Sequence, residues 1–64
     1  MERILETHRF GPHDVIVLEH ADDDGTTYSV LVDNMPVTDP LPVPPSFADI
    51  VLIYARTLGD VSRA

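Results

Sequence analysis

Residues 14–33, DVIVLEHADDDGTTYSVLVD, decide the fold of this chain. The runs 14–20 and 27–33 are short and rich in β-branched and other apolar residues, which is typical of strands. The segment between them contains Asp24-Gly25, and glycine accepts the positive φ that a hairpin turn requires. We therefore predict a β-hairpin whose alternate side chains point to opposite faces of a sheet.

The segments on either side of the hairpin extend this sheet. Residues 1–10 are interpreted as a first strand or as an arm, and a Gly-Pro pair at 11–12 indicates a turn after them. Beyond the hairpin, Asp33-Asn34 indicates a further turn and Met35–Thr38 a short strand. These segments predict an antiparallel sheet of three or four strands.

A proline-rich connector follows the sheet. Residues 39–46, DPLPVPPS, hold four of the six prolines, which remove backbone donors and favour extended geometry. The connector leads into a helix at residues 47–58, and residues 60–64 are expected to form a frayed tail. The whole chain, 1–64, is thus predicted to be one small α+β domain in the order β-β-β-α, with the C-terminal helix packed against the sheet.

The helix has clear signals at both ends. Ser46 is placed to cap it, and Asp49 three residues later completes a capping-box pattern. Gly59 is the predicted C-terminal stop. Nine of the twelve positions in 47–58 are apolar, which is more than one contact with a sheet would cover.

The surplus apolar residues predict an interface. A 64-residue chain buries only ~60% of the surface that its unfolded form exposes. Without cysteine it lacks disulfides, so a second copy or another protein is the expected stabiliser. The residues expected to form an apolar interface are Leu52, Ile53, Val15 and Val17.

The charge of the chain is one-sided. Eleven carboxylates face four arginines, the net charge is −7, and residues 10–55 contain no Lys or Arg. Direct binding to nucleic acid or to an anionic membrane is disfavoured, since both need a cationic surface. A basic protein surface is the expected partner. The carboxylates predicted to bind it, grouped around one end of the hairpin, are Asp14, Glu19, Asp22, Asp23, Asp24 and Asp33.

Neither a cofactor nor a metal is expected. An EF-hand frame on the Asp22–Gly25 cluster would put His20 and Leu31 at positions that require acids. The three histidines at 8, 13 and 20 lack zinc-site spacing. No nucleophile elbow, Walker loop or dinucleotide motif occurs, so the chain is predicted not to be an enzyme.

These features lead to two functional hypotheses. In size, acidity and lack of cysteine or catalytic groups, the chain is similar to small phage-encoded inhibitors of bacterial defence, such as anti-CRISPR and anti-restriction proteins. That resemblance is one of overall character and implies a non-enzymatic inhibitor whose acidic surface mimics nucleic acid on a partner. The alternative is an accessory or antitoxin-like subunit, or a homodimer, that binds through the apolar helix and the Pro-rich segment. The N-terminus lacks signal-peptide features, so a cytoplasmic location, in its own or a host cell, is expected.

Overall fold

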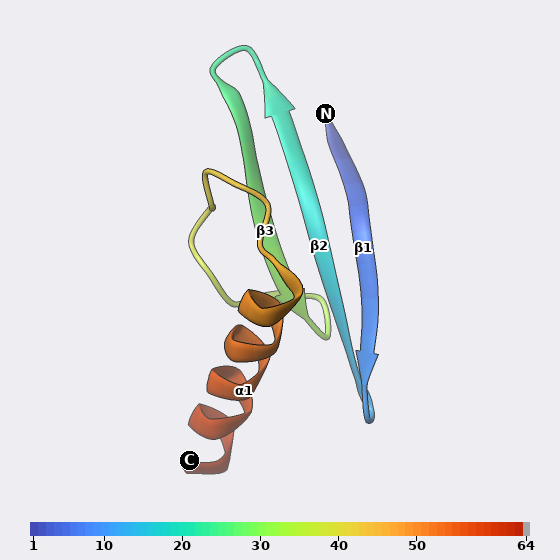
Figure 1. Ribbon diagram of the computed structural model, residues 1–64, viewed down its shortest axis with the longest axis vertical. Helices are drawn as coiled ribbons and strands as arrows, with labels where there is room; N and C mark the ends of the chain where they lie inside the picture. Colours follow the sequence, from blue (N-terminus) through green and yellow to red (C-terminus); the bar gives the residue numbers. More distant parts are fainter. Residues whose placement is uncertain (64) are drawn as a thin grey trace.

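A computed structural model of the protein describes the backbone of residues 1–63 and the side chains of residues 1–59 (Figure 1). It contains a four-stranded antiparallel sheet followed by one helix, so the predicted α+β class is confirmed, with the order β-β-β-β-α. Residue 64, the end of the predicted tail, lies outside the described residues. The elements are β1 (Glu2–Phe10), β2 (His13–Asp22), β3 (Gly25–Val32), β4 (Met35–Pro36) and α1 (Phe47–Arg63).

The sheet is a simple meander in the order β1-β2-β3-β4. Residues 1–10 therefore form a strand rather than an arm, and this strand has an irregularity in its register between Ile4 and Glu6. The β3–β4 turn places Asp33 and Asn34 at positive φ, as a tight two-residue hairpin turn requires. Gly25 follows the β2–β3 turn at φ 133°, a conformation that side chains rarely adopt.

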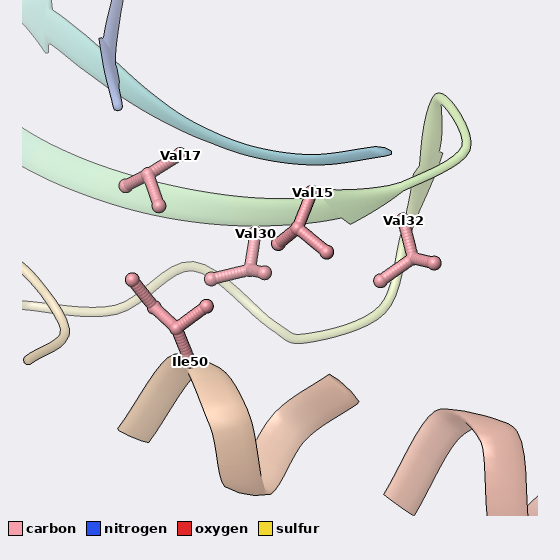
Figure 2. Packing of buried hydrophobic residues seen from close by; sticks show 5 residues of the cluster. All are labelled: Val15, Val17, Val30, Val32 and Ile50. Carbon is pink, nitrogen blue, oxygen red and sulfur yellow. The ribbon is translucent and has the colours of Figure 1, made fainter. Parts of the chain in front are cut away.

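The core lies on one face of this sheet. Four valines from β2 and β3 point toward α1, where Ile50 meets them (Figure 2). Ile50 is fully buried and is the single helical residue in this cluster of buried side chains. The β2–β3 register explains the grouping, because residues directly opposite each other share a face. The valines are Val15, Val17, Val30 and Val32.

The capping box forms as predicted, whereas the predicted helix stop does not. The Asp49 backbone N–H donates to the Ser46 hydroxyl, and the Ser46 N–H donates to the Asp49 carboxylate, both at 3.2 Å. The helix continues past Gly59 to Arg63. Glycine ends a helix when it takes positive φ, and Gly59 is not among the positive-φ glycines.

The connector closes one edge of the sheet. The backbones of Leu41 and Tyr28 exchange two hydrogen bonds of 2.7 and 2.9 Å, so the chain pairs again with β3 before it turns into α1. The Tyr54 hydroxyl donates to the Phe10 carbonyl at 3.0 Å and fastens the middle of the helix to the end of β1. The helix and the connector thus both lie on the face that carries the buried valines.

Candidate functional site

An apolar groove runs between the connector and the helix, and we call it the helix–connector groove. It encloses a cavity of about 300 Å³. Leu52 and Val43 are 63% and 64% exposed on it, and Ile53 lies deeper and packs on the core. The predicted interface residues Leu52 and Ile53 are therefore brought together. The lining residues are Leu41, Pro42, Val43, Pro45, Asp49, Leu52, Ile53 and Arg56.

The charges of the groove come from the two polar residues of its lining. Asp49 and Arg56 are seven positions apart on α1, which places them two helical turns, ~10 Å, from each other. Asp49 already accepts the Ser46 N–H at the start of the helix. The groove thus has an apolar floor, an anion near one end and a cation near the other.

A second charged feature lies at the far end of the β2–β3 hairpin, and we call it the acidic tip. It consists of Asp22, Asp23 and Asp24, all exposed, at the turn that Figure 1 shows at the top. The Asp22 carboxylate accepts the Asp24 backbone N–H at 2.9 Å and shapes the turn. Among the described side chains, no cation forms an ion pair with any of the three.

The other three predicted carboxylates do not join the acidic tip. Asp14 is the second residue of β2 and Asp22 is the last, which separates them by eight residues or ~27 Å. Each of these carboxylates also has a cationic or histidine partner: Arg9 lies 3.5 Å from Asp14, Arg3 lies 3.2 Å from Glu19, and His13 lies 2.6 Å from Asp33. The expected surface of six carboxylates around one end is therefore wrong in its geometry. The sequence did not reveal that Arg3 and Arg9 of β1 lie beside Glu19 and Asp14 of β2 and offset their charges.

The His13–Asp33 pair is the tightest polar contact at the opposite end of the sheet from the acidic tip. The His13 ring nitrogen lies 2.6 Å from one Asp33 oxygen, and the Asp14 backbone N–H donates to the other at 3.1 Å. Hydrogen bonding by His13, then by Asp14, lowers the pKa of the Asp33 carboxyl below its ordinary value of 3.8. The pair borders a second apolar cavity of about 330 Å³ with Met35, Thr57 and Leu58.

The prediction that Val15 and Val17 belong to an apolar interface is wrong. Both are 0% exposed beneath α1, so they belong to the core and not to a surface. The side chains that alternate with them, Ile16 and Leu18, are only half-buried and lie on the opposite face of the sheet. The alternation of residues 14–20 showed apolar side chains on both faces, but it did not indicate which face the helix would cover.

The histidine and acidic side chains of the described part of the chain are spread over several strands and the helix. Within this part of the chain, no group of three or more His, Asp or Glu side chains is arranged to hold a metal ion. In the same residues, no helix has the length and apolarity to cross a membrane.

The geometry thus offers two candidate binding surfaces, an apolar groove and an acidic tip. A scan against protein-family models found no matching family, and searches of curated proteins and of solved structures found no similar chain.

Proposed function

We propose that this protein is a small, non-enzymatic binding subunit that docks on another protein through the helix–connector groove. One observation carries the proposal: Leu52 and Val43, from segments that are separate in the sequence, expose most of their surface on the two sides of one cavity. An open apolar cavity with a few polar groups at its border is a typical binding site. This proposal develops the accessory-subunit hypothesis and assigns its contact surface to the groove.

The lining of the groove defines the chemistry of the partner. Its floor fits a segment that inserts an aliphatic or aromatic side chain, the kind of anchor that dominates protein interfaces. Asp49 and Arg56 favour a basic group on one side of that anchor and an acidic group on the other. A cavity of about 300 Å³ has room for one or two such side chains.

The test compares two variants with similarly exposed apolar residues. Peptides are selected on the native protein from a displayed random library, and their binding is measured by calorimetry as monomeric peptides. We expect them to share an apolar anchor and to lose at least tenfold in affinity for the Leu52→Asp variant. Ile4→Asp is the control, because Ile4 is 58% exposed on the opposite face of the sheet. Equal affinity for Leu52→Asp and native protein would refute the proposal.

A second candidate function rests on the acidic tip. Three exposed carboxylates, which have no cationic partner among the described side chains, lie on a turn remote from the helix and favour contact with a basic surface of another protein. In this form the inhibitor hypothesis is restricted to Asp22, Asp23 and Asp24. Phosphate mimicry over a wide face loses its support, because Asp14, Glu19 and Asp33 each contact an arginine or a histidine.

The acidic tip has its own test. The triple variant Asp22→Asn, Asp23→Asn, Asp24→Asn should retain the fold and lose binding to a basic partner, and native binding should weaken steeply with salt. Polylysine and a set of purified nucleic-acid-binding domains serve as probes. If the triple variant binds these probes as well as native protein does, the acidic tip is not a binding site.

A further inference from the structure

The sheet has a second face, which we call the open face, and no described element packs on it. The strand register arranges this face in four rows of side chains across β1, β2 and β3. The two middle rows are largely apolar, and Ile4 in one of them is 58% exposed. These rows comprise Ile4, Leu18 and Ser29, then Thr7, Ile16 and Leu31.

The two outer rows of the open face are charged. Arg9 lies opposite Asp14 in one outer row, 3.5 Å from its carboxylate. Glu2 lies opposite His20 in the other, 3.0 Å from its ring. An apolar centre between polar margins is the usual anatomy of a protein interface.

We propose that the open face binds a second copy of this chain, so that two sheets pack back to back with their helices outside. The twofold axis runs in the plane between the sheets and across the strands. Each β1 then lies over the partner copy's β1 in the reverse direction. The result is a sandwich of two four-stranded sheets, the arrangement by which a sheet that is apolar on both faces buries both of them.

Charge selects this direction over its alternative. With the axis across the strands, Arg9 of each copy faces Glu2 of the other, and opposite charges meet at both margins. The two acidic tips then lie at opposite ends, separated by about the ~30 Å length of the sheet, beyond the ~8–10 Å Debye length. With the axis along the strands, the two acidic tips would lie side by side and repel each other.

The size of the open face fits a modest interface. Three strands ~4.8 Å apart, each with about eight residues at ~3.4 Å, span roughly 14 by 27 Å. Covering this face on both copies removes ~800 Å² in projection, and more once side-chain relief is counted, which is below the standard size and in the range of weak, transient interfaces. The accessible surface of 4607 Å² also exceeds the ~4,100 Å² expected for a monomer of 7.1 kDa. We therefore expect a dimer that dissociates in the micromolar range.

This assembly leaves the helix–connector groove free, because the groove lies on the covered side of the sheet with α1. One dimer would then present two grooves facing away from each other. The dimer and the groove are independent, so either can fail in experiment without the other.

Sedimentation velocity from ~1 μM to ~1 mM tests the proposal, since interfaces of this size associate in that range. Native protein should pass from monomer to dimer, and Ile4→Asp should weaken the dimer at least tenfold. Leu52→Asp, on the other side of the molecule, is the matched control and should leave the dimer unchanged. Thr7→Arg adds bulk to the open face without removing an apolar contact, so it reports on the interface even if Ile4→Asp unfolds.

The direction of the two sheets has a separate test. Arg9→Glu alone and Glu2→Arg alone should each weaken the dimer, whereas the double variant Glu2→Arg, Arg9→Glu should restore it. A monomer throughout the concentration range would overturn the proposal. So would a native dimer that tolerates both Ile4→Asp and Thr7→Arg, because another surface would then hold it together.

Discussion

Ile50 anchors α1 to the sheet, and its truncation should cost much of the stability of the protein. It is fully buried against four valines and is the one helical residue in the buried cluster (Figure 2). Ile50→Ala removes three carbons, which lowers the transfer free energy by ~2.5 kcal/mol at ~0.8 kcal/mol for each buried CH₂ group. A residual cavity adds up to ~2 kcal/mol, so we expect a loss of ~3–4 kcal/mol. A domain of this length has only ~3–10 kcal/mol of stability.

Urea denaturation followed by circular dichroism measures this loss, at one fixed protein concentration because self-association stabilises the folded state. With a slope near 1 kcal/mol per M, the midpoint should fall by ~3 M, or the cooperative transition should disappear. Ile50→Val should cost ~1 kcal/mol and remains measurable if the alanine variant unfolds. Leu52→Ala, at a residue that is 63% exposed, is the control and should change stability by less than ~0.5 kcal/mol. If Ile50→Ala cost no more than Leu52→Ala, the packing described here would be wrong.

Two further predictions concern local interactions. Ser46→Ala removes the hydroxyl that accepts the Asp49 N–H at 3.2 Å and should lower stability by ~1 kcal/mol in the same urea assay. Ser46→Thr keeps the hydroxyl and should retain most of this stability. If Ser46→Ala left the urea midpoint unchanged, the cap would contribute nothing to stability. Because its folded pKa is lowered, Asp33 should stabilise the protein above its ordinary pKa of 3.8, and this contribution should be lost as the pH falls through the lower folded pKa. The urea midpoints of native protein and Asp33→Asn should therefore converge below pH 3.8, and a constant gap between them would contradict the role of the His13 contact.

Local signals in the sequence predicted the elements well. The β-branched runs of the hairpin, the turn at Asp33-Asn34 and the reciprocal Ser46–Asp49 cap depend on neighbours within a few residues. The helix end was wrong, because glycine permits a stop without requiring one, and the helix runs on to Arg63. Turn and cap chemistry is thus visible in sequence, while the length of an element also depends on what it packs against.

The apolar and charged surfaces were harder to predict. Nine of the twelve predicted helical positions are apolar, so periodicity indicated a broad face but not the line along which the helix docks. In the structure Ile50, Ile53 and Tyr54 pack on the core, whereas Phe47, the first residue of the helix, is 58% exposed. Such a pattern fixes the docking line only when polar residues restrict it.

The sequence by itself determined the β-hairpin, the helix that follows the sheet, the strong acidity and the absence of known catalytic motifs, because these depend on local residue chemistry. Only the tertiary structure decided which face of the hairpin is core, since alternation is symmetrical until a helix covers one side. It also decided which carboxylates stay unpaired. Strand register, which the sequence does not encode locally, brings Arg3 and Arg9 beside β2. Of the six carboxylates that were predicted to bind a partner, Asp14, Glu19 and Asp33 each contact an arginine or a histidine. In the described part of the chain, the three carboxylates of the acidic tip have no cationic partner.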